Sequence, residues 1–458
     1  MRSPLADVAT IASLMITTSL FGFSNAMVAP LLPKIQRSFG AGVGFGGLVF
    51  AISLAIAGPG TLLVALAAEK FGNRPVLLTV LSMYVAASVA VALSYSVPVV
   101  LVARGAQGLS GALLPCSYAV VRSVYSGRKA VRVTALLSGC LGFAGGIGLF
   151  VVGLSDMPYR SVAMVWWAGT GLFGLVLVAL FVPRDRPVAA DGPSRAGEIG
   201  TFSAGVLLVL LPLLYMRWFL DHVVLGSVSL VVGVALVALS PRLSAEGRST
   251  LFPARGLVVA NVTNICSISG FFGMFVVAPP YLVERYPDGW LGRGLLPMAV
   301  VLLFPSVASM AGSRLAGRML ARRFGAADRL VTLGGLVAAC GLLVCGVWPG
   351  VVGVMMASMA VVGLGTGAAF AGLAESLARS GSVASRTGTL VAGRYAGGAL
   401  GGALVAVILD NHTAGSGLAG TVRLSLFILA LVQIVGTGLW TGRGAFGAAR
   451  GTEIAPAA

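Results

Sequence analysis

Long apolar stretches alternate along the whole chain with short breaks that hold charges, proline and glycine. A helix that crosses a bilayer needs about 20 mostly apolar residues. The candidate stretches are 8–32, 42–66, 75–95, 98–121, 133–153, 161–182, 201–216, 223–240, 256–282, 294–313, 330–347, 350–373, 387–409 and 422–441. The pattern therefore predicts an all-α polytopic membrane protein with 14 transmembrane helices.

Composition and charge agree with this class. Of the 458 residues, 57% are hydrophobic and 10% are charged, whereas soluble proteins carry about 25% charged residues. The net charge of +17 does not indicate a nucleic-acid partner, because the arginines recur in short loops and form no single basic patch. With the N-terminus on side one, 22 of the 31 Lys and Arg fall on that side and 7 on the other. This bias predicts that both termini are cytoplasmic.

Weak internal matches recur at one offset along the chain. They are "AAEKFG" (67–72) with "LARRFG" (320–325) at 253 residues, "GLSGALL" from Gly108 with "GLGTGAA" from Gly363 at 255, and "RVTALLSG" (132–139) with "RTGTLVAG" (386–393) at 254. We expect two pseudo-symmetric six-helix halves, as in carriers that move around a central site. The expected division is 1–182 for the N-terminal half, 183–254 for a linker, two inserted helices and a loop, and 255–458 for the C-terminal half. The linker at 183–200 is expected to be solvated, and Glu198 with it.

The loop after the second stretch, "ALAAEKFGNRPVLL" (65–78), combines a glycine with charges. Gly72 permits a tight turn. Glu69, Lys70 and Arg74 could bridge helices in one conformation and hold an inner gate closed. The alternative is that the cations are a positively charged anchor at the inner surface.

The fourth stretch holds polar residues in an apolar helix. Arg104, Gln107, Gly108, Gly111 and Tyr118 lie on one helical face. A guanidinium inside a membrane is costly and normally faces the bundle interior or a water-filled cavity, although an arginine can also snorkel to the interface. We expect Arg104, Gln107 and Tyr118 along a substrate pathway.

The fifth and sixth stretches add further candidates. The fifth, "SGCLGFAGGIGLFVVG" (138–153), contains Gly142, Gly145 and Gly146, and such glycines suit close helix packing. Trp166 and Trp167 in the sixth are interface anchors, cavity walls or core.

These stretches together resemble the major facilitator superfamily, and within it the fourteen-helix drug:proton antiporter branch. The 65–78 loop is similar to the family's Gly-x-Leu-x-Asp-Arg-x-Gly-Arg-Arg pattern, and the fourth stretch to its Arg-x-x-Gln-Gly-x-Gly pattern. The fifth is similar to the glycine-rich antiporter helix. The resemblance implies a secondary active exporter of small amphiphilic compounds, working by alternating access in the bacterial inner membrane. It also implies protons as the coupling ion, a monomer, and neither a cofactor nor a metal.

The sequence departs from that branch in its acids. The branch usually has an aspartate in its first helix, where this chain has Ser24 or Asn25, and none of the 14 acids falls at the middle of a stretch. Proton coupling is therefore implied by the resemblance alone. Asn25 lies at about the depth of Arg104, so we expect Asn25 or the substrate to satisfy that guanidinium. Arg394 in the thirteenth stretch either faces a cavity or snorkels, and the two arginines could attract anionic or zwitterionic substrates.

Other functions fit less well. Both histidines, His222 and His412, lie at the outer ends of stretches, and no catalytic triad, metal spacing or phosphate loop is present, which argues against an enzyme. A sensor would more often carry a sizeable soluble domain. An importer or facilitator of a small metabolite that is independent of protons stays open as the alternative.

Overall fold

The computed structural model describes residues 4–40, 43–155, 157–184, 196–214, 223–243, 255–285, 296–322, 326–378, 383–410 and 417–448. The first helices are α1 (Pro4–Phe39), α2 (Val43–Phe71), α3 (Asn73–Leu93), α4 (Val97–Gly108), η1 (Leu109–Ala112), α5 (Leu113–Val124), α6 (Gly127–Leu154), α7 (Tyr159–Val162), η2 (Ala163–Ala168) and α8 (Gly169–Phe181). The later ones are α9 (Ala196–Leu214), α11 (Val223–Leu239), η3 (Ser240–Leu243), α12 (Arg255–Arg285), α13 (Leu296–Arg322), α14 (Ala326–Val347), α15 (Val352–Ala378), α16 (Val383–Asp410) and α17 (Gly417–Ala448).

Helices occupy all of the expected stretches. In the described residues, eleven helices are long and apolar enough to cross a membrane. Three shorter apolar helices, Ala144–Leu154, Gly197–Leu210 and Val223–Leu239, fall on the other three stretches. The helices also run past the apolar stretches into charged sequence. The tenth, expected at 294–313, continues as α13 to Arg322.

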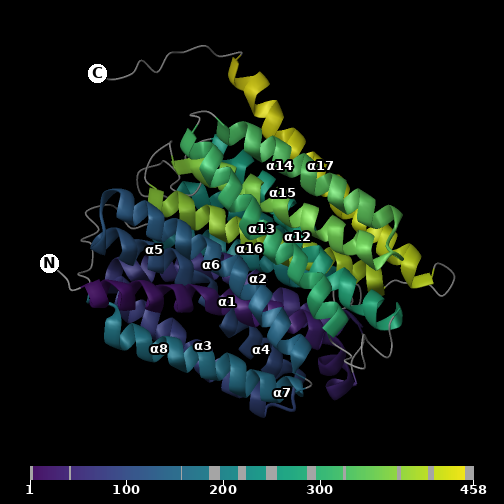
Figure 1. The fold of residues 1–458 in the computed structure, drawn as a ribbon, viewed down its shortest axis with the longest axis horizontal. Coiled ribbons are helices and arrows are strands. Elements are labelled where there is room, and N and C mark those ends of the chain that lie inside the picture. Colours follow the sequence, from purple (N-terminus) through teal and green to yellow (C-terminus); the bar gives the residue numbers. More distant parts are fainter. Residues whose placement is uncertain are drawn as a thin grey trace.

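Two groups of helices lie side by side in Figure 1, one from α1 to α8 and one from α12 to α17. Within the first group α1 packs on α6, α2 on α4, and α3 on α8. Within the second, α12 packs on α16, α13 on α15, and α14 on α17. The same three pairings therefore occur in each half, as the sequence repeat predicts.

Individual contacts repeat as well. The hydroxyl of Thr10 donates to the carbonyl of Phe181, and the hydroxyl of Thr263, 253 residues later, donates to the carbonyl of Gly436. These two bonds tie the first helix of each half to its last.

Glycine contacts repeat in the same way. A Cβ added to Gly108 would lie 2.3 Å from the carbonyl oxygen of Ser53, and one added to Gly363 would lie 2.1 Å from that of Pro305. Glycine is needed at both positions because the two backbones touch.

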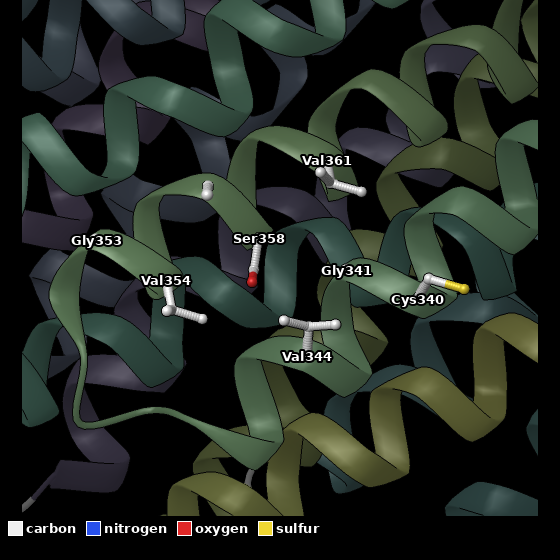
Figure 2. A pocket seen from close by; sticks show the side chains of 8 residues that line it. Cys340, Gly341, Val344, Gly353, Val354, Ser358 and Val361 are labelled. Carbon is white, nitrogen blue, oxygen red and sulfur yellow. The ribbon is translucent and has the colours of Figure 1, made fainter.

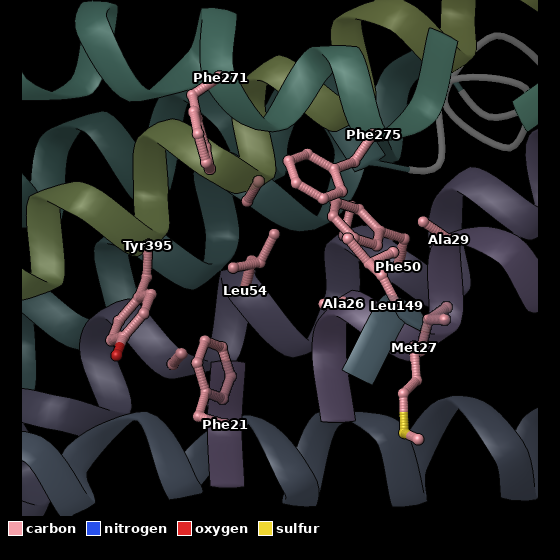
Figure 3. Packing of buried hydrophobic residues seen from close by; sticks show 14 of the residues in the cluster. Phe21, Ala26, Met27, Ala29, Phe50, Leu54, Leu149, Phe271, Phe275 and Tyr395 are labelled. Atoms are coloured by element: carbon pink, nitrogen blue, oxygen red, sulfur yellow. The ribbon is translucent and has the colours of Figure 1, made fainter. Parts of the chain in front are cut away.

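The halves meet along two helix pairs, α2 with α16 and α6 with α13. A Cβ added to Gly58 of α2 would lie 3.2 Å from the carbonyl oxygen of Ala392 in α16, and one added to Gly146 of α6 would lie 2.8 Å from Leu303 in α13. Figure 3 shows the apolar side chains between the halves, where the ring of Phe50 faces the rings on α12. Small residues and a cluster of aromatic rings thus form this interface.

Prolines inside the helices leave carbonyl groups that neighbouring helices take up. Proline has no N–H, so it cannot bond the carbonyl four residues earlier. Pro212 in this way frees the carbonyl of Leu208, which accepts a 2.8 Å bond from the Ser229 hydroxyl of α11. Membrane helices tolerate proline where such partners exist.

The inserted helices α9 and α11 form a closely packed pair. A Cβ on Gly205 would lie 2.7 Å from the carbonyl oxygen of Gly233, and one on Gly233 would lie 2.8 Å from that of Gly205. This is the close crossing that small residues permit in membranes. The other side of α9 packs on both α2 and α16.

The expectation that Glu198 belongs to a solvated linker is wrong. The linker becomes helical at Ala196, and the side chain of Glu198 is fully buried in the first turn of α9. Its neighbour Ile199 packs with Leu62 and Ala392, one residue from each half. Glu198 is buried because the helix begins before it, which places it next to the packed residues of α9.

Candidate functional site

Arg104 lies at the centre of a buried polar network. Its Nη1 donates to Oε1 of Gln107 at 2.6 Å, and its Nη2 donates to Oδ1 of Asn25 at 2.9 Å and to the Ser53 hydroxyl at 3.0 Å. Its Nε donates to the carbonyl of Val49 at 3.3 Å. Four of the five guanidinium N–H groups are thus satisfied.

The network continues to α3 and to the sixth span. Gln107 Nε2 donates to the Ser88 hydroxyl at 2.8 Å, and Ser88 in turn donates to the carbonyl of Tyr84. The guanidinium carbon of Arg104 is 5.2 Å from the ring centre of Trp167, so the aromatic face also stabilises the cation. Trp167 is 1% exposed, which makes it a core residue rather than an interface anchor.

Two expectations about Arg104 can be compared with these contacts. The side chain is 1% exposed and does not snorkel to the surface. The contact with Asn25 that the sequence predicted is present. Ser53, Ser88 and Val49 were missed, because serine hydroxyls and carbonyls are common in membrane helices and carry no sequence signal.

The electrostatics of this network are unusual for a membrane interior. Within the described part of the chain, Arg104 makes no ion pair, so neutral dipoles and the Trp167 ring stabilise its charge. A buried cation without a counter-ion is costly unless its hydrogen bonds are made. The network therefore joins α1, α2, α3 and α4 within the N-terminal half. Whether Arg104, Gln107 and Asn25 meet substrate stays a prediction.

Arg394 has a different environment. It lies in α16, with its guanidinium carbon 4.5 Å from the ring centre of Phe370 in α15. It also interacts electrostatically with Tyr118 of α5, which belongs to the opposite half. The described residues offer this guanidinium no hydrogen bond and no ion pair.

Tyr395 joins the halves beside Arg394. Pro115 has no N–H and so leaves the carbonyl of Gly111 without its helical partner. The Tyr395 hydroxyl donates to that carbonyl at 3.3 Å. The Tyr395 ring packs edge to face on Phe21 at 4.7 Å, and both rings appear in Figure 3. A Cβ on Gly111 would lie 2.8 Å from this ring, so glycine makes room for it.

The remaining helix-packing glycines are on α6. Gly145 faces Ala26 and the carbonyl of Gly22 on α1, while Gly146 faces Leu303 of the other half. Gly142 lies one turn earlier in the same helix. One side of α6 thus packs within its half and an adjacent side packs between the halves.

The predicted inner gate is not closed by an ion pair in this conformation. Glu69 and Lys70 are exposed at the end of α2, and Glu69 forms no salt bridge with any described residue. Gly72 has φ +89° and begins the turn into α3, a conformation that only glycine adopts readily. Arg74 donates to the carbonyl of Ala179 in α8. The gate role of these residues stays a prediction.

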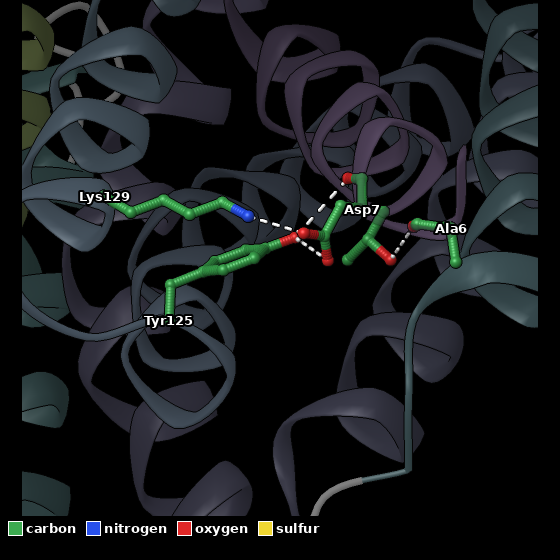
Figure 4. Close-up of polar contacts among 5 residues, drawn as sticks. Ala6, Asp7, Tyr125 and Lys129 are labelled. Atoms are coloured by element: carbon green, nitrogen blue, oxygen red, sulfur yellow. Dashed lines mark hydrogen bonds and ion pairs between the residues drawn. The ribbon is translucent and has the colours of Figure 1, made fainter. Parts of the chain in front are cut away.

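An ion pair does join helices α1 and α6 near their first turns. The Nζ of Lys129 contacts Oδ2 of Asp7, and the Tyr125 hydroxyl reaches the same carboxylate, as Figure 4 shows. The contact lies within the N-terminal half. Both charged side chains keep some exposure, so the pair contributes little to stability.

A hollow of about 330 Å³ lies between α14 and α15 (Figure 2). Its wall is apolar except for Ser358 and Cys340, and several of its valines are exposed on the surface of the bundle. Ser358 stands 254 residues after Arg104, so the C-terminal half has no counterpart of that arginine. In the residues described here, no group of three His, Cys, Asp or Glu could hold a metal ion.

Two proteins of similar sequence carry the name of multidrug resistance proteins. The chain is 26% identical over 378 residues to the "Multidrug resistance protein B homolog" of Mycobacterium tuberculosis (strain ATCC 25618 / H37Rv), which is 76% of this chain and 66% of that protein. It is 24% identical over 220 residues to "Multidrug resistance protein MdtL" of Escherichia coli (strain SMS-3-5 / SECEC), which is 47% of this chain and 53% of that protein. The chain thus spans less than two thirds of the length of either relative.

Solved structures share the fold. The human organic anion transporter MFSD10 (TETRAN) superposes with a TM-score of 0.66 at 16% identity, covering 96% of this chain and 100% of that one. The nucleoside transporter NupG superposes with a TM-score of 0.63 at 13% identity, covering 94% of this chain and 98% of that one. The family model of the Major Facilitator Superfamily matches residues 14–406. The helix pairings that recur in each half, and the two helix pairs between the halves, agree with this match. The match shows that the chain belongs to the Major Facilitator Superfamily of membrane transporters.

Proposed function

We propose that the chain is a secondary active exporter of small amphiphilic compounds, drugs or secondary metabolites, that works by alternating access. The observation that carries this proposal is the interface between the halves, 1–182 and 255–458. Its two helix pairs, α2 with α16 and α6 with α13, are equivalent under the repeat. Glycines on α2 and α6 line them. Two equivalent helix pairs of this kind allow the halves to rock about a site between them.

The names of the relatives support drug export. Both sequence relatives are multidrug resistance proteins by name. The apolar and aromatic side chains between the halves suit an amphiphilic substrate. The bias of cations toward one side supports a multi-pass protein of the bacterial cytoplasmic membrane with both termini in the cytoplasm. We take the chain to act as a monomer.

Proton coupling needs a titratable group that responds to the movement of the halves. Ser24 or Asn25 occupies the helix position where the resembled branch usually has an aspartate, so α1 does not supply the group there. Glu198 is the candidate we favour. It is fully buried in α9, next to Ile199, which contacts both halves through Leu62 and Ala392.

The transport proposal is tested in everted vesicles from cells that produce the protein. Tetraphenylphosphonium, 2-naphthoate and a zwitterionic fluoroquinolone are added outside, with and without an acidic lumen. An exporter accumulates at least one of them in the lumen faster than empty-vector vesicles do. If none moves faster than in those vesicles, the export proposal fails.

The coupling proposal is tested in the same vesicles with Glu198→Gln. The variant is expected to keep flux down a substrate gradient and to lose accumulation driven by the acidic lumen. The exposed Glu284 is the matched control, and Glu284→Gln is expected to change neither. Accumulation by Glu198→Gln at the normal level would contradict the assignment.

One observation favours the alternative of a proton-independent importer or facilitator of a metabolite. It is the neutral Asn25 beside the Arg104 guanidinium, where an acid would be required for coupling in the resembled branch. Equal flux in both directions and with or without the pH gradient would support this alternative.

A further inference from the structure

The two membrane-embedded arginines differ in how well the protein satisfies them. Arg104 uses four of its five donors on Asn25, Ser53, Gln107 and the Val49 carbonyl, and is 1% exposed. A ligand would have to displace these partners to reach it. Arg394 makes none of these bonds among the described residues.

Arg394 is buried only in part, so its guanidinium is not sealed off as that of Arg104 is. The helix that carries Arg394, α16, packs on α2 and α5 of the opposite half. Arg394 therefore lies where the halves meet.

The neighbours of Arg394 orient the guanidinium without neutralising it. Phe370 covers it at 4.5 Å from the ring centre, and Phe370 itself packs on the cluster of Ala260, Leu373 and Leu390. Stacking on an aromatic ring leaves the N–H groups at the edge of the guanidinium plane free to donate. Tyr118 of the other half lies close enough to interact with Arg394 electrostatically.

A guanidinium whose edge is free has a specific chemical preference. Its parallel N–H groups match the two oxygens of a carboxylate, and this bidentate bond is about twice as strong as one between neutral groups. Inside a membrane protein an unpaired cation raises the free energy of the empty state. An anion that binds it removes that cost, whereas a lipophilic cation would increase it.

We infer that Arg394, stacked on Phe370 where the halves meet, is the binding site for the carboxylate of an amphiphilic anion or zwitterion. This inference rests on the proposed transport function and names its substrate class. The Phe21–Tyr395 ring pair, whose members are 4% and 1% exposed, fixes the helix position next to the site. Arg104 has a structural role in this conformation, because four of its donors are bonded within the N-terminal half.

The test measures binding to the purified full-length protein in neutral detergent by calorimetry. The probes are 2-naphthoate, its neutral analogue 2-naphthamide, and tetraphenylphosphonium. Arg394→Gln is expected to weaken naphthoate binding at least tenfold, about 1.4 kcal/mol, and to leave naphthamide binding unchanged. Arg394→Lys keeps the charge but lacks the planar guanidinium, so its naphthoate affinity should lie between those of the wild type and Arg394→Gln. The exposed Arg318 provides the control, and Arg318→Gln should bind like the wild type.

A second measurement keeps the inference falsifiable if binding is weak. Because Arg394 makes no hydrogen bond in the described chain, Arg394→Gln breaks none and removes an uncompensated charge. The variant should therefore melt at a higher temperature than the wild type without ligand, and naphthoate should raise the melting temperature of the wild type alone. A variant that melts lower and still responds to naphthoate overturns the inference.

The remaining outcomes separate the site from the transport function. Naphthoate binding that depends on Arg394, without flux of any probe, supports the site and refutes export. Flux of tetraphenylphosphonium with no binding of naphthoate overturns the site and leaves export standing. Displacement of naphthoate by phosphatidylglycerol at lipid concentrations would assign the guanidinium to a lipid phosphate, which also overturns the inference.

Discussion

Replacing Asn25 by leucine tests whether neutral dipoles stabilise the buried charge of Arg104. The amide oxygen accepts bonds of 2.9 Å from Arg104 Nη2 and 2.7 Å from the Ser53 hydroxyl. The Asn25 Nδ2 has no hydrogen-bond partner among the residues that the structure describes, so its removal costs little. Leucine has nearly the same size, and the change therefore acts mainly on the hydrogen bonds.

The magnitude follows from the bonds that are lost. A hydrogen bond to a charged group contributes about 1.5–3 kcal/mol, while hydrogen bonds between neutral groups in membrane proteins average about 0.6 kcal/mol. Ser53 keeps the Phe50 carbonyl as an acceptor, and Arg104 keeps its other partners. We expect Asn25→Leu to lower the free energy of unfolding by about 2 kcal/mol.

The assay is equilibrium unfolding in mixed micelles of dodecyl maltoside and dodecyl sulfate, followed by tryptophan fluorescence. The control is Gln433→Leu, another buried amide, which donates to the neutral Ser267 hydroxyl at 3.1 Å. Gln433→Leu should lower the free energy of unfolding by about 0.6 kcal/mol. A double-mutant cycle of Asn25→Leu with Arg104→Leu should show a coupling of about 1 kcal/mol or more. Additivity within about 0.4 kcal/mol would refute the reasoning.

Three further substitutions test the packing and the loops. Gly108→Ala places a methyl 2.3 Å from the α2 backbone and should lower the free energy of unfolding by about 1–3 kcal/mol, whereas Gly317→Ala, with open space around it, should raise it slightly. Gly72→Ala imposes φ +89° on a residue with a side chain and should cost about 1–3 kcal/mol, measured by the same unfolding. Asp7→Asn removes a partly exposed ion pair and should change stability by less than about 1 kcal/mol. For the inner gate, Glu69→Ala should lower the transport rate with normal membrane insertion, and an unaltered rate would refute the gate role.

The sequence predicted the fold to a large extent because hydrophobic length and the repeat are physical constraints on the whole chain. Every span had to be apolar, so the fourteen stretches coincide with helices. The repeat at about 254 residues predicted two like halves, and contacts do recur between them, such as Gly108 on Ser53 and Gly363 on Pro305. Helix ends were less accurate, because helices continue into charged sequence.

The polar contacts were less predictable. Asn25 was found because its depth matched that of Arg104, but Ser53 and Ser88 could not be found, since their roles depend on how helices rotate against each other. Phe370 is one of 21 phenylalanines, and only its position over Arg394 distinguishes it. Glu198 was assigned to a loop because it lies outside the apolar stretch, and hydrophobic patterning does not show how far a helix extends into a charged linker.

The inserted pair has a mechanical consequence for the carrier. Helix α9 lies along the junction of α2 and α16, and its Ser203 hydroxyl donates to the Pro59 carbonyl of α2 at 3.4 Å. If the halves rotate as proposed, α9 would move with the N-terminal half, to which it is bonded, and would slide over α16. Because α9 spans the junction, it would also shield the junction between α2 and α16 from lipid acyl chains.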